Sequence, residues 1–363
     1  MFNQIAEFIN PSKNPDLTQA HEFQREHLPT LWLLGKTGAG KSSFIQAVTG
    51  LSSVEVGNGF EPCTITSQAY DFPKQQPIMR FLDTRGLGEA NYDPADDLAK
   101  IDQLANAVIV VMKADEPEQS AVLSALKQIK KNKQIKHLLL IHSAVLQSNE
   151  SDRERLVTFN EKQVRDVWGN KFESISIDFE CEDGSIYNYE LLLSELTKML
   201  PVIGLLVEEK DHSTVEEANF NKLKKEVLWY ASSASASDLI PAVGLVSVPA
   251  IQAKLLHSLA NQYGIEWNKR TLSELIGTLG GGFALQYSFK LGARQLIKLI
   301  PVYGQTVGAV AAAAMSFATT YGLGRAACYY FYHKSKGNEV SSEEMQRLYK
   351  EALEKGKEAT AYE

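Results

Sequence analysis

The first half of the chain alternates short, continuous apolar runs with polar stretches of helical spacing. Five apolar runs are expected to form strands: residues 31–35, 78–83, 107–112, 137–142 and 174–179. The intervening stretches Asp115–Lys131 and Ser151–Trp168 have the polar character of surface helices. Strands that are apolar at every position are typical of a parallel sheet covered on both faces. The pattern therefore predicts an α/β fold with a mostly parallel sheet.

The second half, residues 215–335, is poor in charge and rich in Ala, Gly and Ser. Its longest run without Asp, Glu, Lys or Arg is Leu299–Gly324. At about 1.5 Å per residue this run could cross a hydrocarbon core of ~30 Å. Its small residues, however, drive membrane insertion only weakly. Three interpretations stay open: the core of a helical bundle, a reversibly inserting hairpin, or a constitutive membrane span.

These shifts in composition predict five segments along the chain. They are a helical N-terminal extension (1–27), an α/β domain (28–204), a linker (205–214), a charge-poor all-α domain (215–336) and an amphipathic helix (337–363). In the extension, Phe2, Ile5 and Ile9 share one helical face. At the other end, Ser341 and Glu344 form a capping box that opens the last helix.

Overall composition excludes several classes of protein. The chain has 37 basic and 44 acidic residues, a net charge of −7, and 44% hydrophobic residues, which excludes a disordered chain. The acidic balance argues against nucleic acid as a partner. Cys63, Cys181 and Cys328 are far apart, and the N-terminus lacks the pattern of a secretory signal. We expect a cytoplasmic protein, either free or attached or inserted at the inner face of the cell membrane.

The strongest chemical motif directly follows the first predicted strand. It reads GKTGAGKS and fits the phosphate-binding pattern GxxxxGK[ST]. Backbone N–H groups of such a loop surround a phosphate chain, and the following helix adds its N-terminal dipole. Lys41 is expected to contact the β- and γ-phosphates as a catalytic residue, and Ser42 to ligate Mg2+. The nucleotide-binding residues of this motif are Gly35, Lys36, Thr37, Gly38, Ala39, Gly40, Lys41, Ser42 and Ser43.

A second motif, Asp83-Thr84-Arg85-Gly86, ends the strand at 78–83. Parallel topology places its carboxylate beside the phosphate loop. Asp83 is expected to hold Mg2+ through a water molecule, and the Gly86 N–H to contact a γ-phosphate. Loss of that phosphate would release the loop that follows.

Between the two motifs, residues 57–66 read GNGFEPCTIT. A threonine in this interval is suited to close over Mg2+ and to take part in catalysis. Thr64 is the first choice and Thr66 the alternative, because both hydroxyls lie in the right interval. The plainer interpretation, that both residues simply open a strand, stays open.

The segments GKTGAGKSS, PCT and DTRGLGE, in this order, resemble the translation-factor-related, Era-like class of GTPases. More narrowly, the chain resembles bacterial GTPases with a C-terminal helical hydrophobic domain, and more remotely the interferon-inducible immunity GTPases. The resemblance covers residues 28–202 and, with lower specificity, 215–335. It implies that GTP and GDP are the bound nucleotides, with slow Mg2+-dependent hydrolysis and nucleotide-controlled association with a membrane or a protein partner.

The chain departs from this family where guanine is read. The motif [NT]KxD should follow the strand at 137–142, but the sequence there is His142-Ser143-Ala144-Val145. His142 and Ser143 are the residues expected to replace the usual base contacts. Asp115, in the sequence Met112-Lys113-Ala114-Asp115, is a less favoured candidate. An ATP-preferring protein remains an alternative.

A second departure concerns hydrolysis. Leu87 stands where some GTPases carry a glutamine that orients the attacking water, and an apolar side chain cannot do this. A partner, a second copy in a homodimer or a bound cation would then supply the missing group. Arg85 is a candidate in trans, although a solvated surface arginine is the simpler interpretation. A nucleotide-binding module with negligible hydrolysis is the alternative function.

The helical domain also carries a basic stripe. Lys290, Arg294 and Lys298 recur every four residues and would share one face of a helix. Such a face suits an anionic membrane surface, and it equally suits a solvated surface of a soluble helix.

Overall fold

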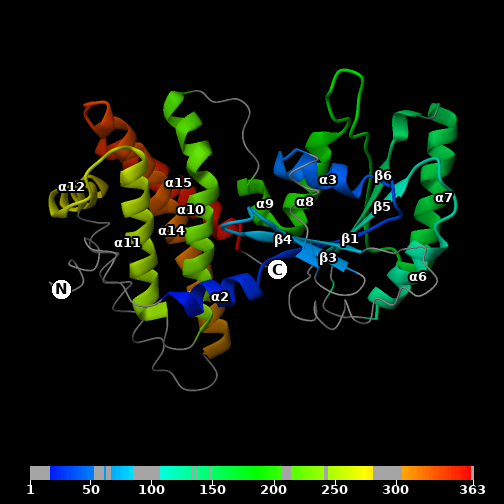
Figure 1. Ribbon diagram of the computed structural model, residues 1–363, viewed down its shortest axis with the longest axis horizontal. Coiled ribbons are helices and arrows are strands. Elements are labelled where there is room, and N and C mark those ends of the chain that lie inside the picture. The colour runs from blue at the N-terminus through cyan, green and yellow to red at the C-terminus, as the bar shows by residue number, and fades with distance from the viewer. Residues whose placement is uncertain are drawn as a thin grey trace. The chain divides into compact units, whose positions relative to one another are not determined.

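The computed structural model describes residues 17–52, 61–62, 67–84, 107–131, 135, 137–147, 149–206, 214–240, 244–280 and 305–360. The chain divides into two compact units. The α/β unit comprises His27–Val207, and the helical unit comprises Met1–Glu26 together with Glu208–Glu363 (Figure 1). Both ends of the chain therefore belong to the helical unit.

The α/β unit contains a seven-stranded sheet with the order β2-β3-β4-β1-β5-β6-β7. The strands are β1 (Thr30–Leu34), β2 (Glu61–Pro62), β3 (Ser67–Phe72), β4 (Met79–Thr84), β5 (Ala107–Lys113), β6 (His137–Ser143) and β7 (Glu173–Ser176). From β4 to β7 every pairing is parallel, whereas β2 and β3 pair in antiparallel fashion at one edge. The carboxyl ends of the five parallel strands thus share one edge of the sheet, where open α/β sheets bind ligands.

The predicted α/β fold with a mostly parallel sheet is confirmed. Strands β1 and β5 are buried almost throughout, as continuous apolar runs require. Most boundaries agree with the expectation within two residues, and two differ by three or more. Strand β7 ends at Ser176, and Asp178 forms an isolated antiparallel bridge with Tyr187. The helix expected from Asp115 begins later, because Lys113–Gln119 forms a turn that contains Pro117.

Helices cover both faces of this sheet. They are α3 (Lys41–Thr49), α6 (Ser120–Ile129), α7 (Glu150–Trp168), α8 (Tyr189–Met199) and α9 (Pro201–Leu206), with a short 3-10 turn at Val145–Gln147. Helices α6 and α7 bury the face that carries Trp32, Val110 and Leu140. Helix α3 covers the opposite face. There the rings of Phe44 and Phe81 pack edge to face, with their centroids 6.3 Å apart.

The helical unit consists of α2 (Thr18–Glu26), α10 (Val215–Leu239), α11 (Gly244–Gln262), α12 (Lys269–Leu279), α14 (Gln305–Ser335) and α15 (Ser342–Glu358). Helix α14 is its core element, and residues 316–331 are buried on all sides. The described part of the uncharged run 299–324 therefore lies mostly inside a bundle. Among the described helices, none combines the length and the apolar character needed to cross a bilayer.

Glycine lets the helices of this unit approach closely. A methyl group on Gly324 of α14 would overlap the side chain of Val227 on α10. A methyl on Gly356 of α15 would lie 2.8 Å from Ala318 Cα, which is closer than real Cβ atoms come. Small residues in the charge-poor segment thus serve helix packing, a role they have in water as well as in lipid.

Several polar side chains inside the bundle are paired. Arg325 on α14 donates to both carboxylate oxygens of Glu216 on α10, at 2.6 and 2.8 Å, and both side chains are 9% exposed. The Arg325 guanidinium also lies 4.7 Å from the ring centre of Phe220. Gln252 donates to Thr320 Oγ1 at 2.9 Å. The pair of Arg325 and Glu216 favours one register of α10 on α14, because an unpaired buried charge is costly.

The N-terminal helix α2 packs on α10. The ring of His21 stacks on Trp229 with centroids 4.8 Å apart, and Ser233 Oγ donates to Gln24 Oε1 at 2.5 Å. The expected face of Phe2, Ile5 and Ile9 lies outside the described residues. At the other end, Ser341 Oγ accepts a hydrogen bond from the Glu344 N–H, as the capping box predicts. The body of the unit therefore includes helices from both ends of the chain.

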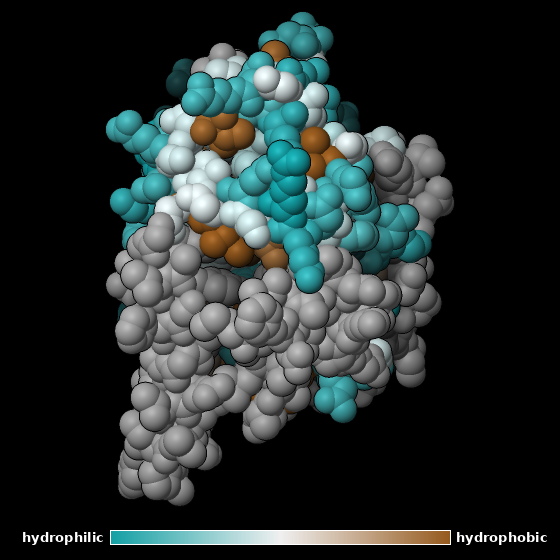
Figure 2. Space-filling view, turned by 90° about the vertical axis from the view of Figure 1, so that its left-hand side faces the viewer, coloured by the Kyte–Doolittle hydropathy of each residue, from teal (hydrophilic) through white to brown (hydrophobic). Residues whose placement is uncertain are grey.

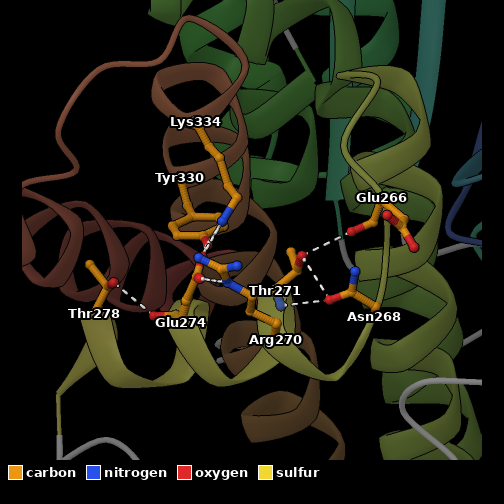
Figure 3. A network of polar contacts seen from close by, with 8 residues as sticks. All are labelled: Glu266, Asn268, Arg270, Thr271, Glu274, Thr278, Tyr330 and Lys334. Carbon is orange, nitrogen blue, oxygen red and sulfur yellow. Dashed lines mark hydrogen bonds and ion pairs between the residues drawn. The ribbon is translucent and has the colours of Figure 1, made fainter.

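Helix α12 is joined to α14 by a surface network (Figure 3). Glu274 accepts hydrogen bonds from Arg270 on its own helix at 2.8 Å and from Tyr330 and Lys334 on α14. The bond from Lys334 is the leading cause that lowers the pKa of Glu274, to about 2. Figure 2 shows the side of the molecule that lies at the left in Figure 1. The described residues seen there are mainly hydrophilic or neutral, with hydrophobic residues in a few separate places.

Candidate functional site

The phosphate-binding motif forms the turn between β1 and α3. Gly35 follows the last residue of β1, and a methyl group on it would lie 2.5 Å from the backbone oxygen of Val111 on β5. Gly38 and Gly40 have φ angles of +80° and +99°, which glycine adopts without strain. Gly40 then caps α3, whose first N–H groups have no partner within the helix. The glycines therefore create a loop with backbone donors directed toward an anion.

Lys41 is held at the centre of this loop. Its Nζ donates to the backbone oxygens of Gly35 at 2.7 Å and Lys36 at 3.1 Å. The same nitrogen lies 3.8 Å from Asp83 Oδ1. Burial lowers the pKa of Lys41, and the neighbouring Asp83 opposes this shift. The Lys41 ammonium group is thus held by two backbone oxygens of the loop, and the Asp83 carboxylate partly balances its charge.

Asp83 reaches this position because β4 lies next to β1. The register pairs Asp83 with Leu33, near the carboxyl end of β1. Ser42 is exposed on the first turn of α3, one residue after Lys41. A hydroxyl and a carboxylate at one phosphate loop are oxygen donors of the kind that Mg2+ prefers. The donor chemistry therefore fits a magnesium nucleotide.

Ser143 joins strand β6 to the loop. Its Oγ donates to the Ala39 oxygen at 2.7 Å, and the side chain is 3% exposed. Its backbone oxygen accepts from the Ala114 N–H at 2.9 Å, which ties the end of β5 to the same point. A methyl group on Gly40 would lie 3.5 Å from Ser143 Cβ and 3.4 Å from the ring of Phe179. Ser143 thus links the end of β6 to the phosphate loop through Ala39.

The structure does not bring His142 to the loop. Side chains alternate along a strand, so His142 points to the opposite face from Ser143. It is 0% exposed, its Nε2 contacts Ser174 Oγ at 3.1 Å, and burial lowers its pKa to about 4. His142 is therefore a buried residue between β6 and β7, and its expected contact with the base stays a prediction. The sequence alone did not reveal this, because both residues end one apolar run.

The acidic turn after β5 makes a contact that the sequence does not predict. Lys36 Nζ donates to the Glu116 carboxylate, to Glu118 Oε2 at 2.9 Å and to the Glu118 backbone oxygen at 2.9 Å. Glu118 Oε1 in turn accepts from the N–H of Ser120 at 3.0 Å and from its hydroxyl. Hydrogen bonds from Ser120 and then Lys36 lower the pKa of Glu118 to about 2. Lys36 of the phosphate loop is thus bound to the acidic turn that precedes α6.

Of the remaining candidate site residues, one lies in the described part of the chain and the others lie outside it. Asp115 is exposed and pairs with Lys113 at 3.2 Å. Thr64, Thr66, Arg85, Gly86 and Leu87, and the basic stripe Lys290, Arg294 and Lys298, lie outside the described residues. Among the described residues, no cluster of His, Cys, Asp and Glu could hold a metal ion by protein ligands alone.

Comparison with known proteins agrees with this geometry. Residues 30–143 match the family model described as "50S ribosome-binding GTPase". The magnetosome membrane protein 22 of Magnetospirillum gryphiswaldense is 30% identical over 144 residues, which cover 39% of this chain and 71% of that protein. The chain belongs to the P-loop GTPases.

Two further relatives extend the comparison. The T-cell-specific guanine nucleotide triphosphate-binding protein 2 of Mus musculus is 25% identical over 234 residues, which cover 59% of this chain and 55% of that protein. Among solved structures, the bacterial selenocysteine-specific elongation factor EF-Sec is 18% identical with a TM-score of 0.35, covering 48% of this chain and 28% of that one. The chain thus spans about half of the mouse relative and a smaller share of the elongation factor.

Proposed function

We propose that this GTPase binds GTP with Mg2+ and hydrolyses it slowly to GDP and phosphate. The observation that carries the proposal is the position of Lys41. Its Nζ rests on the loop oxygens of Gly35 and Lys36 and lies 3.8 Å from Asp83, at the N-terminus of a helix. A cation, a set of N–H donors and a carboxylate together suit a triphosphate with its metal.

Each residue has a role in this proposal. Lys41 binds the β- and γ-phosphates, and Ser42 and Asp83 hold Mg2+, the latter through water. The metal, when bound, neutralises charge on the phosphate oxygens. Thr64 and Gly86 complete the site in our proposal and respond to the γ-phosphate. We assign Ser143 to the support of the loop and leave His142 out of the nucleotide contacts.

Guanine is the proposed base because the chain is a GTPase by family and because a relative is named for guanine nucleotide triphosphate binding. The carboxylate of the usual base-reading motif is missing after β6, where Ala144 and Val145 stand. The protein must therefore recognise guanine through other groups, and we expect the preference over ATP to be smaller than in GTPases with that motif.

Single-turnover hydrolysis tests the catalytic part of the proposal. Purified full chain in excess over radiolabelled GTP should release phosphate slowly with Mg2+, and stop when the metal is chelated. The Lys41→Ala variant should release none. Nucleotide binding without any phosphate release would favour the alternative of a module that holds nucleotide without hydrolysis.

We further propose that nucleotide controls association of the protein with a membrane or a protein partner, through the helical unit or through a homodimer. Support comes from the pairing of a phosphate site with a helical unit whose segment 215–335 is poor in charge, and from a relative named as a magnetosome membrane protein. A bound nucleotide can shift such an equilibrium only by binding the two states differently.

Flotation with anionic liposomes tests the membrane part. The full chain is incubated with liposomes and with either GTP or GDP, at low and high salt. Flotation that differs between GTP and GDP supports a switch, and equal flotation indicates a constant anchor. No flotation in either state would leave a protein partner or a homodimer as the target of the switch, which sedimentation velocity with each nucleotide would reveal.

A further inference from the structure

Lys36 lies inside the phosphate motif, yet its side chain is directed to the acidic turn. An ammonium group has three N–H donors and no acceptor. Three acceptors surround Lys36 Nζ: the Glu116 carboxylate, Glu118 Oε2 and the Glu118 backbone oxygen. A phosphate oxygen could bind this nitrogen only by displacing one of them.

The turn that holds Lys36 is itself fixed. Glu118 Oε1 is bound by Ser120 at the start of α6. Gln119, which is 2% exposed, donates from Nε2 to the Glu116 backbone oxygen at 2.8 Å. The Glu116 N–H donates to the Lys113 oxygen at the end of β5. Lys36 is therefore bound to a rigid part of the α/β unit.

The backbone of Lys36 takes part in the site directly. Its oxygen accepts from Lys41 Nζ at 3.1 Å and from the Ala39 N–H at 3.2 Å. Lys36 thus contacts the acidic turn through its side chain and the phosphate-binding lysine through its backbone oxygen.

We propose that Lys36 is a positioning residue, held by Glu116 and Glu118 so that the phosphate loop keeps its binding conformation before nucleotide arrives. The inference rests on the proposed function, since it concerns nucleotide binding at the same loop. Preorganisation of a loop increases affinity because less ordering is left to occur on binding.

A phosphate-binding role and a positioning role of Lys36 predict opposite changes in nucleotide affinity when the charges of Glu116 and Glu118 are removed. If Lys36 bound phosphate itself, the two glutamates would compete with the nucleotide, and removing their charge would strengthen binding. If Lys36 positions the loop, removing their charge releases the loop and weakens binding. Deleting two negative charges near a polyanion by itself strengthens binding, so weaker binding by the double variant must come from the lost contact with Lys36.

The experiment uses the full chain, a fluorescent GTP analogue and Mg2+ in a stopped-flow instrument. The double variant Glu116→Gln, Glu118→Gln and the single variant Lys36→Gln should each weaken binding by about fivefold, with Lys36→Arg restoring most of it. The triple variant should be no weaker than Lys36→Gln, because all three residues act through one contact. Glu150→Gln, on the first turn of α7, is the matched control for loss of surface charge.

The outcomes separate this inference from the proposed function. Wild-type protein that fails to bind the analogue refutes the proposed function. Wild-type protein that binds, combined with tighter binding by the double glutamine variant, overturns the positioning role. Unchanged binding by both Lys36→Gln and the double variant also overturns it. Equal melting temperatures of the variants and the wild type exclude unfolding as the cause of any loss.

Discussion

The hydroxyl of Ser143 donates a 2.7 Å hydrogen bond to the backbone oxygen of Ala39, linking residues 104 positions apart in the chain. This bond joins the end of β6 to the phosphate loop. Ser143 lies in the segment where GTPases carry the guanine-binding motif [NT]KxD. In this chain the segment contacts the phosphate loop through Ser143 but has no aspartate to bind the base.

We expect Ser143→Ala to weaken nucleotide binding by about fivefold, because the buried Ala39 oxygen loses its donor. Equilibrium titration with a fluorescent GTP analogue measures the change. Ser174→Ala is the matched control, since Ser174 contacts His142 on the next strand and not the loop. A similar loss in both variants would show that the effect comes from general destabilisation of the sheet.

Replacement of Asp83 by Asn should separate metal binding from nucleotide binding. The side chain keeps its shape but loses the charge beside Lys41. We expect nucleotide dissociation in Mg2+ to accelerate about tenfold, with a smaller effect in EDTA, because outer-sphere partners of a metal commonly have this influence. Exposed Asp115→Asn serves as the control. Equal effects of Asp83→Asn in both conditions would make Asp83 a structural residue, and a large effect of Asp115→Asn would restore it as a base reader.

The strands illustrate how much of this fold the sequence predicts. The apolar runs of β1, β5 and β6 became strands because central parallel strands have both faces buried, so composition alone determines them. The edge strand β7 is only partly buried and is shorter than its run predicts. The glycines and Lys41 were equally predictable, since their roles depend on local backbone geometry. His142 was not, because its burial depends on which face of β6 it occupies. The contacts of Lys36 with Glu116 and of α2 with Trp229 were not predictable either, because they join residues distant in sequence.

Buried His142 should make the protein less stable in mild acid. Its pKa is lowered from 6.5 to about 4 by burial, so the unfolded chain binds the proton more readily than the folded one. The stabilising contribution is therefore complete above pH 6.5 and is lost as the pH falls toward 4, in total by about 3 kcal/mol. Urea unfolding at a series of pH values measures the slope. His142→Gln should flatten it, and His137→Gln, exposed on the same strand, should not. Equal slopes for wild type and His142→Gln would contradict the prediction.

Close packing of α14 on α10 predicts a cost for any side chain at Gly324. A methyl group there overlaps Val227, so Gly324→Ala should lower the free energy of unfolding by about 1–3 kcal/mol. Gly277→Ala is the matched control because a methyl at this helical glycine meets no atom within 4 Å. That variant should be unchanged or more stable by up to about 1 kcal/mol. A stability gain in both variants would mean that α10 and α14 are not in close contact.

Binding of GTP by the loop around Lys41 is tested most directly by titration of the full chain with a fluorescent GTP analogue in Mg2+. The bound analogue is then displaced with GTP or with ATP. We predict saturable binding that GTP displaces better than ATP. Lys41→Ala should weaken this binding by about a hundredfold, because it removes the charged donor at the centre of the loop, whereas exposed Lys127→Ala should not. Unchanged affinity of a folded Lys41→Ala variant would contradict the account.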